Sequence, residues 1–165
     1  MRKLIAGVVL GVLAVPAAAA DPDVTLTEAT TAAVDAAIAS HKGKVVLVDV
    51  WFLACSPCVK KFPHLVELHK KYGPDGLVCV TVDRLADELK RQDKGREFLK
   101  KQGAAFPNYI LKDAEDAVDG WLTKHGLDPQ PAVGLWDRAG KRVKLSDDPT
   151  DEEVEAAIRK ALAEK

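Results

Sequence analysis

The chain of 165 residues is poor in cysteine, which occurs three times, at positions 55, 58 and 79. Three cysteines allow one pair and a remainder, so the chain is not a small domain held together by a network of disulfides. An excess of charge is also missing, because 24 basic residues face 25 acidic ones. That balance does not indicate a nucleic-acid partner. No internal repeat, linker or low-complexity tract divides residues 21–165, which we expect to form one domain.

A long hydrophobic run is missing as well. The most apolar segment, residues 4–15, is shorter than the roughly 20 residues that a bilayer-spanning helix needs. It follows two basic residues and ends in three small ones at 18–20, a pattern typical of a cleaved secretory signal peptide. An uncleaved membrane anchor is the alternative. We therefore expect residues 1–20 to be a signal peptide and the rest to be exported to the bacterial periplasm or cell envelope, without stable membrane insertion after cleavage.

Strands and helices are predicted to alternate along the rest of the chain. Short apolar runs predict buried strands, and apolar positions that recur at helical spacing predict helices. The predicted strands are 45–50, 77–82, 106–111, 132–136 and 141–145, and the predicted helices are 28–40, 58–72, 85–101, 114–125 and 151–163. Such alternation indicates an α/β fold in which helices cover both faces of a central sheet.

The most informative feature is the junction between strand 45–50 and two cysteines. Cys55 and Cys58 are separated by only two residues, and Cys55 is expected at the first turn of the next helix. Unpaired backbone N–H groups and the positive end of the helix dipole favour a thiolate at that position. Cys58 lies one turn later on the same side, where it can close a small disulfide ring. We therefore predict that Cys55 attacks a disulfide and that Cys58 resolves the product.

A zinc site is the first alternative for this pair. Zinc needs two more ligands, but the chain has no second CxxC motif, and His64 and His69 do not project from one helix face with the cysteines. Redox chemistry is therefore favoured, and no dissociable cofactor or metal is expected. Cys79 lies in the middle of an apolar run and is interpreted as a small core residue.

The segment around the two cysteines resembles the active site of the thioredoxin superfamily. Five residues carry this resemblance by their order and spacing: Asp49, Trp51, Cys55, Cys58 and Pro63. The resemblance implies a thioredoxin-like three-layer sandwich, a mixed central sheet with helices on both faces. It also implies that Pro63 bends its helix and that Asp49 lies beneath the active site. A copper carrier of the same superfamily is a further alternative, although such proteins usually space their cysteines differently.

The resemblance extends to a buried proline that faces the cysteines and is cis in this superfamily, which Pro131 matches. Together with Gln130, it would present backbone groups to an extended substrate that carries a thiol. Trp51 and Ala54 complete the predicted substrate-binding set, and Trp51 is also interpreted as a packing residue under the active site. Two of these positions depart from the usual pattern. The superfamily often has tryptophan at the position of Ala54, and threonine or valine at the position of Gln130. The departures leave the choice of partner open.

The chain between Asp83 and Pro131 is longer than a plain thioredoxin needs, by about one helix and one short strand. This insertion resembles the TlpA and ResA branch, whose members are exported or membrane-tethered thiol-disulfide reductases. The resemblance implies that the protein reduces protein disulfides and takes electrons from an upstream thiol-disulfide donor. A disulfide-introducing oxidase is the alternative enzyme. A binding module with a structural Cys55–Cys58 bond is the non-enzymatic alternative.

Asp49 is the single acid in the strand that leads to the cysteines. Buried acids are rare without partners, so this residue is either a hydrogen-bonded core carboxylate or a functional group. In an apolar setting behind Cys58, desolvation would raise the pKa of Asp49 and allow it to take the proton from that thiol. We predict this proton transfer.

Overall fold

The computed structural model describes residues 24–85 and 90–164. The predicted signal peptide, residues 1–20, lies outside the described residues. Among the helices of the described ranges, none combines the length and the apolar character that crossing a membrane requires. The elements in chain order are β1 (Thr27–Ala29), α1 (Thr31–Ser40), β2 (Val45–Trp51), α2 (Ser56–Tyr72), β3 (Leu77–Asp83), α3 (Gln92–Gln102), β4 (Asn108–Leu111), α4 (Glu115–His125), β5 (Ala132–Trp136), β6 (Arg142–Val143) and α5 (Asp151–Ala163).

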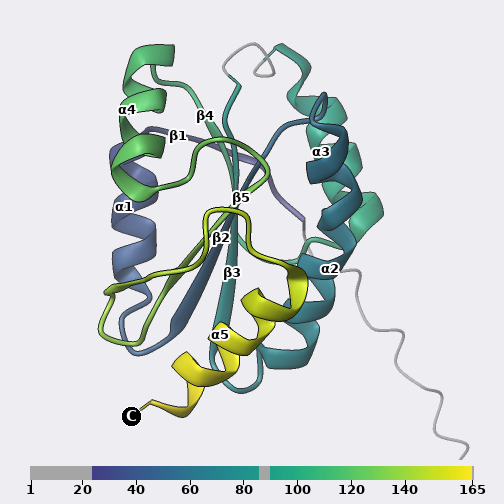
Figure 1. Cartoon of the computed structure of the whole chain (residues 1–165). Coiled ribbons are helices and arrows are strands. Elements are labelled where there is room, and N and C mark those ends of the chain that lie inside the picture. The colour runs from purple at the N-terminus through teal and green to yellow at the C-terminus, as the bar shows by residue number, and fades with distance from the viewer. Residues whose placement is uncertain (1–23, 86–89, 165) are drawn as a thin grey trace, which may run out of the picture.

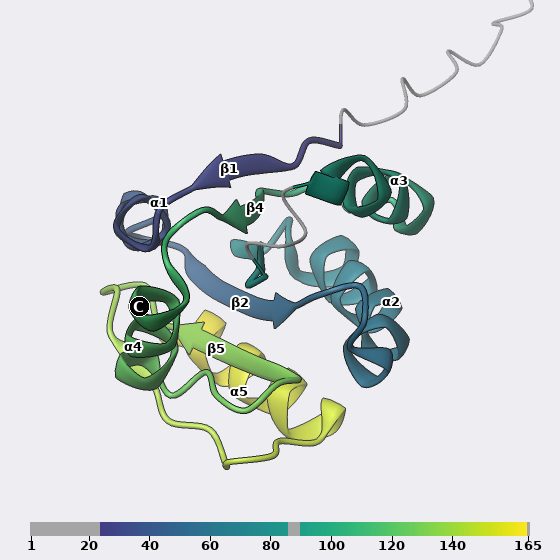
Figure 2. The same ribbon diagram turned by 90° about the horizontal axis from the view of Figure 1, so that it is seen from above.

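The strands of the described residues form one mixed sheet, which is the middle layer of the molecule (Figure 1). Its strand order is β1-β4-β3-β2-β5-β6. The first four of these strands run parallel to one another, and β5 and β6 are antiparallel to their neighbours. Helices α1 and α4 cover one face of the sheet, and α2, α3 and α5 cover the other (Figure 2). The α/β three-layer arrangement expected from the sequence is confirmed.

The central strand β2 contributes side chains to two hydrophobic cores. Its even-numbered residues pack in the core beneath α1 and α4, whereas its odd-numbered apolar residues pack in the core beneath α2 and α5. All residues of β2 are buried, as predicted for a strand covered by helices on both faces. Because side chains alternate along a strand, Asp49 faces α2. The fold thereby directs this acid toward the helix that carries Cys58.

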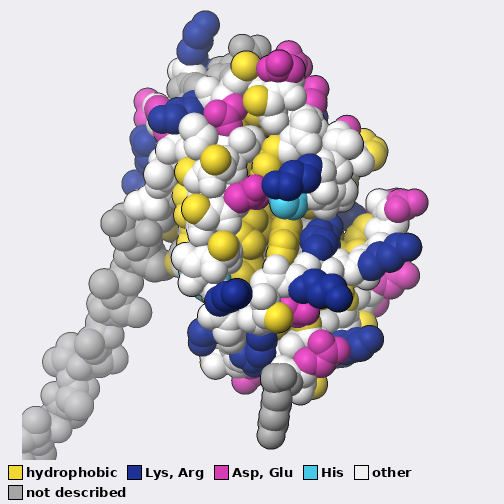
Figure 3. Space-filling model, turned by 90° about the vertical axis from the view of Figure 1, so that its left-hand side faces the viewer, with side chains coloured by type: hydrophobic (Ala, Val, Ile, Leu, Met, Phe, Trp, Pro, Cys, Tyr) yellow, Lys and Arg dark blue, Asp and Glu magenta, His cyan; other side chains and the backbone are white. Residues whose placement is uncertain are grey.

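The opposite face is held together by contacts between α1 and α4. Asp35 of α1 accepts hydrogen bonds from Trp121 Nε1 at 2.7 Å and from Lys124 Nζ at 3.1 Å. Figure 3 shows this side of the molecule, where acidic and basic side chains are interspersed around a strip of hydrophobic ones. The two helices are thus joined at their polar edges as well as through the core.

The helix predicted over 28–40 begins later in the structure. Thr30 is the N-cap of α1, and its side chain accepts the N–H of Ala33 at 3.2 Å. The preceding residues Thr27–Ala29 form β1, which pairs with β4 at the edge of the sheet. The prediction of helix at 28–30 is therefore wrong. The local sequence did not reveal this strand, because its partner lies far away in the sequence.

Further predicted boundaries differ, most of all the start of α3. Helix α3 begins at Gln92 instead of residue 85, and residues 86–89 lie outside the part that the structure describes. Strand β6 comprises only Arg142–Val143 instead of 141–145. Element ends are the least certain part of any pattern analysis, because the pattern continues weakly into the adjoining turns.

Gly134 allows β5 to pass close to two buried neighbours. An added Cβ would lie 2.6 and 2.9 Å from ring atoms of Trp136 and 3.0 Å from Leu127 Cδ2. Because both neighbours are buried and closely packed, we expect Gly134→Ala to lower the free energy of unfolding by about 1–3 kcal/mol. Chemical denaturation of the oxidised protein measures this change.

Gly120 provides the matched control, because it lies in α4 and no atom comes within 4 Å of an added Cβ. The same change there should raise stability by about 0.5–1 kcal/mol, since alanine loses less backbone entropy than glycine in a helix. An unchanged unfolding midpoint for Gly134→Ala would contradict the close packing of β5.

Candidate active site

The predicted cysteine pair lies where β2 passes into α2. Strand β2 ends at Trp51, and Cys55 is the N-cap of α2, which begins at Ser56. Pro57 occupies one of the first helical positions, where its missing N–H costs no hydrogen bond. The N–H of Cys55 donates to the carbonyl of Phe52 at 3.0 Å and holds the connecting turn. Cys55 is therefore fixed at the positive end of the helix dipole, where the sequence places it.

Cys55 and Cys58 form a disulfide with a Cα–Cα distance of 5.3 Å, so the structure represents the oxidised protein. The N–H of Cys58 donates to Cys55 Sγ at 3.3 Å, and it is one of the donors that the first turn of a helix leaves without a helical partner. After reduction, this N–H and the helix dipole would stabilise negative charge on Cys55. Cys55 is 7% exposed and Cys58 is 2% exposed, so Cys55 is the more accessible residue of the two.

The surface beside the disulfide is mostly apolar. Ala54 and Pro57 are exposed, and Phe52 and Leu53 are half-buried. The exposure of Ala54 permits contact with a substrate, and its role in substrate binding stays a prediction.

Trp51 does not fit the substrate-binding role predicted for it. Its side chain is fully buried, and its ring packs against the rings of Phe62 and Phe98 at centroid distances of 5.4 and 5.0 Å. The alternation of side chains along β2 turns this residue into the core beneath α2 and α3. Trp51 therefore supports the active-site turn from below and does not contact a substrate.

Pro131 lies at the same edge of the sheet as the cysteines. Strand β5 begins at Ala132, which pairs antiparallel with Val50 near the end of β2. The chain consequently enters β5 beside the point where the active-site turn leaves β2. The Gln130–Pro131 peptide bond is cis, as the resemblance implies, and the Asp128–Pro129 bond is cis as well. Both Gln130 and Pro131 are half-buried.

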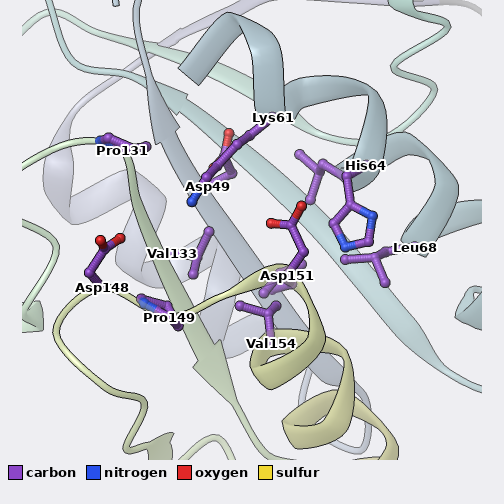
Figure 4. A pocket seen from close by; sticks show the side chains of 12 residues that line it. Asp49, Lys61, His64, Leu68, Pro131, Val133, Asp148, Pro149, Asp151 and Val154 are labelled. Carbon is purple, nitrogen blue, oxygen red and sulfur yellow. The ribbon is translucent and has the colours of Figure 1, made fainter. Parts of the chain in front are cut away.

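Asp49 lines a small pocket between α2, β5 and the start of α5 (Figure 4). The pocket has a volume of about 40 Å³, and Lys61, His64, Pro131 and Asp151 are among its lining residues. Asp49 itself is 9% exposed. Burial raises the pKa of Asp49 to about 7, although the positive charge of Lys61 acts in the opposite direction. A carboxyl group that titrates near neutral pH can accept and release a proton in a catalytic cycle.

The third cysteine lies in the core behind this site. Cys79 is completely buried in β3, and burial raises the pKa of its thiol far above the ordinary range. The interpretation as a core residue is confirmed. Within residues 24–85 and 90–164, no group of three or more His, Cys, Asp or Glu side chains is arranged to hold a metal ion.

Arg84 belongs to the site and was not predicted. It directly follows β3, and its backbone N–H donates to the carbonyl of Trp51 at 3.2 Å. Its guanidinium donates to Gln130 Oε1 at 2.7 Å. Its position directly after a buried strand could have indicated this. Strand β3 is the parallel neighbour of β2, so residues that follow β3 lie at the same edge of the sheet as the turn that leads to Cys55.

The known proteins with related sequences are named thiol-disulfide oxidoreductases. None of the known protein-family models matches this chain. The chain is similar to thiol-disulfide oxidoreductase ResA of Bacillus thuringiensis subsp. konkukian, with 32% identity over 120 residues, which cover 72% of this chain and 64% of that protein. ResA of Bacillus subtilis is 29% identical over 104 residues, which cover 63% of this chain and 53% of that protein. The chain therefore spans between about half and two thirds of the length of these relatives.

Solved structures share the architecture. The thioredoxin domain of a thiol-disulfide oxidoreductase from Bacteroides vulgatus matches with a TM-score of 0.59 and 24% identity, covering 74% of this chain and 83% of that one. A thiol-disulfide isomerase from Corynebacterium glutamicum matches with a TM-score of 0.66 and 20% identity, covering 77% and 86%. At these identities the likeness concerns the fold. It is the thioredoxin-like sandwich that the sequence predicts.

Proposed function

The chain is a ResA-like protein of the thioredoxin superfamily, and on this premise we propose that it is a thiol-disulfide oxidoreductase that uses Cys55 and Cys58. The observation that carries the proposal is the position of Cys55 at the N-cap of α2, where its sulfur accepts the N–H of Cys58. A thiolate is favoured at that position over a thiol. Cys58 is the partner that closes the disulfide.

The reaction proceeds through a mixed disulfide. The Cys55 thiolate attacks one sulfur of a substrate disulfide, and the other substrate sulfur leaves as a thiolate. Cys58, after losing its proton, attacks the Cys55 sulfur, and the remaining substrate sulfur leaves. The substrate gains two electrons and two protons in total, and the enzyme is left with the Cys55–Cys58 bond. An upstream thiol-disulfide donor must then reduce that bond, and the cycle requires no dissociable cofactor.

We propose further that the protein works as a reductase in the bacterial periplasm or cell envelope. Export is supported by residues 1–20, with their basic start, apolar run and small-residue end. Reduction is supported by α3 and β4, the additional helix and strand that resemble the TlpA and ResA branch. A measured reduction potential tests the direction, because thioredoxin lies at about −270 mV and a strong oxidase at about −120 mV.

A Cys58→Ser variant tests the proposed chemistry by stopping it halfway. We use a peptide with one cysteine that carries a thionitrobenzoate group through a disulfide. The reduced variant should release one thionitrobenzoate and retain the peptide on Cys55, because no second thiol can resolve the mixed disulfide. The wild-type protein should release thionitrobenzoate and peptide. Mass spectrometry and the absorbance of thionitrobenzoate measure both results.

The double variant Cys55→Ala, Cys58→Ser is the matched control and should form no adduct. If the single variant is folded and reduced but captures no peptide, the bond between the cysteines is structural and the binding-module alternative holds. With the same variant, adducts from a cell-envelope extract identify the natural partners of the protein.

A further inference from the structure

Arg84 connects three parts of the molecule at the edge where the cysteines lie. Its backbone N–H donates a hydrogen bond to the carbonyl of Trp51, the last residue of β2. Its guanidinium donates to Gln130 Oε1 at 2.7 Å and to Asp119 of α4. Asp128 lies 4.0 Å from the same guanidinium. The Arg84 side chain is only 16% exposed, so two carboxylates and an amide replace most of the water around its charge.

The side chain of Gln130 is held at both ends. Its oxygen accepts from Arg84, and its Nε2 donates to the carbonyl of Leu127 at 2.8 Å. An amide side chain is needed for this arrangement, because threonine or valine could not reach both partners. The glutamine that departs from the superfamily pattern is thus the counterpart of an arginine at position 84.

The ion pairs of Arg84 are not placed to serve stability alone. Asp119 and Asp128 are 53% and 48% exposed, so both carboxylates stay largely solvated in their pairs with Arg84. The short hydrogen bond to Gln130 instead fixes the residue directly before Pro131. The acids keep the guanidinium oriented toward that hydrogen bond.

We propose that Arg84 is a positioning residue, which acts through Gln130 to hold the backbone before Pro131 in place for pairing with an extended peptide. The proposal rests on the proposed function, because it assumes that the peptide reacts with Cys55. It predicts that Arg84 matters for substrates with a peptide backbone and not for small disulfides. The backbone N–H of residue 84 remains in any substitution, so its link to Trp51 is kept.

The experiment compares two probes with reduced protein. One is the peptide with a thionitrobenzoate group, and the other is 5,5′-dithiobis(2-nitrobenzoate), a small disulfide without a peptide backbone. For Arg84→Ala, the half-saturation concentration for the peptide should rise about tenfold, the order expected from loss of a charge-assisted hydrogen bond. The limiting rate and the rate with the small disulfide should stay within about twofold of the wild type, because transition-state contacts at Cys55 are kept.

Four further variants sharpen the result. Arg84→Lys should lie between the wild type and alanine, because an ammonium keeps the charge but cannot hold Gln130 and Asp119 in a fixed fork. Arg96→Ala is the matched control, since Arg96 pairs on α3 with the exposed Asp93 and should change neither reaction. Gln130→Ala should have the effect of Arg84→Ala, and the double variant should be no worse than either single one.

Equal losses with both probes would show that Arg84 serves general folding, and no loss with either would show that it does not position the peptide. Either result overturns the proposal, as do independent, multiplying effects of Arg84→Ala and Gln130→Ala. A wild-type protein that reacts with neither probe would refute the proposed function itself, so the two failures are distinguishable.

Discussion

Replacing Cys55 with serine is expected to abolish disulfide exchange, with a loss of at least about a thousandfold in the rate of attack on a small disulfide. A serine hydroxyl is not ionised at neutral pH and is a poor nucleophile toward sulfur. The same hydroxyl is a favoured N-cap and can accept the N–H of residue 58, which Cys55 Sγ accepts at 3.3 Å in the oxidised protein. The start of α2 should therefore be preserved, and the lower exchange rate should reflect the missing thiol instead of a change in structure.

The measurement is the release of thionitrobenzoate from 5,5′-dithiobis(2-nitrobenzoate) by reduced protein, with circular dichroism to verify the fold. Cys79→Ala is the matched control, because Cys79 is completely buried and should not react in the folded protein. It should retain the exchange rate of the wild type. Exchange by Cys55→Ser above the background rate would mean that Cys58 can attack first, and the assignment of roles would have to be reversed.

The parts of the fold that the sequence predicts well are those whose surroundings are uniform. Every residue of β2 is buried, and a strand covered on both faces shows a nearly continuous apolar run, interrupted here only by Asp49, which pattern analysis detects. Helix α2 is predicted over most of its length and continues through Pro63, because its buried residues recur at helical spacing. The CxxC motif fixes the N-terminal end of that helix, so the positions of both cysteines follow from local information.

The parts that the sequence does not predict depend on contacts between distant segments. Strand β1 exists because it pairs with β4, and the three residues of β1 contain no pattern that indicates this partner. The hydrogen bond between Arg84 and Gln130 joins residues 46 positions apart. Trp51 was open to two interpretations, a substrate contact and a packing residue, and its complete burial supports only the second. Such features require knowledge of which strands are neighbours.

The second large effect is expected for Asp49→Asn, which should slow the resolution of the mixed disulfide about 100-fold at neutral pH, within the range of a lost general base. Asp49 faces α2 and lines the pocket that it shares with Lys61 and Pro131. Because burial raises its pKa to about 7, it is partly ionised at neutral pH, and we predict that it takes a proton from Cys58. Water can still accept that proton, so exchange should be slowed but not abolished.

The pH profile separates this role from a change in structure. In the wild type, the rate of resolution should rise with pH and level off above the pKa of Asp49, which lies at about 7. The profile of Asp49→Asn should lack that inflection. Stopped-flow measurement of peptide release from the mixed disulfide at a series of pH values gives both curves. Asp93→Asn, at an exposed acid on α3, is the control and should match the wild type.

The same substitution should make the oxidised protein more stable at alkaline pH. The folded-state pKa of about 7 lies above the ordinary value of 3.8, so the folded protein keeps a proton that the unfolded chain releases between these values. Stability therefore falls as the pH rises through this window and stays reduced above it. Removing the charge should restore up to about 4 kcal/mol at about pH 8 and almost nothing near pH 4.

Together, these two effects of Asp49→Asn distinguish a proton acceptor from a satisfied core carboxylate. A carboxylate held by hydrogen bonds would stabilise the fold, and its replacement would lower stability at alkaline pH and leave the pH profile of resolution unchanged. A desolvated carboxylate destabilises the fold in its charged form and is retained for what it does during exchange. Slower resolution with higher alkaline stability follows only from the second situation, because burial raises the energy of the charged form and thereby makes Asp49 able to accept a proton near neutral pH.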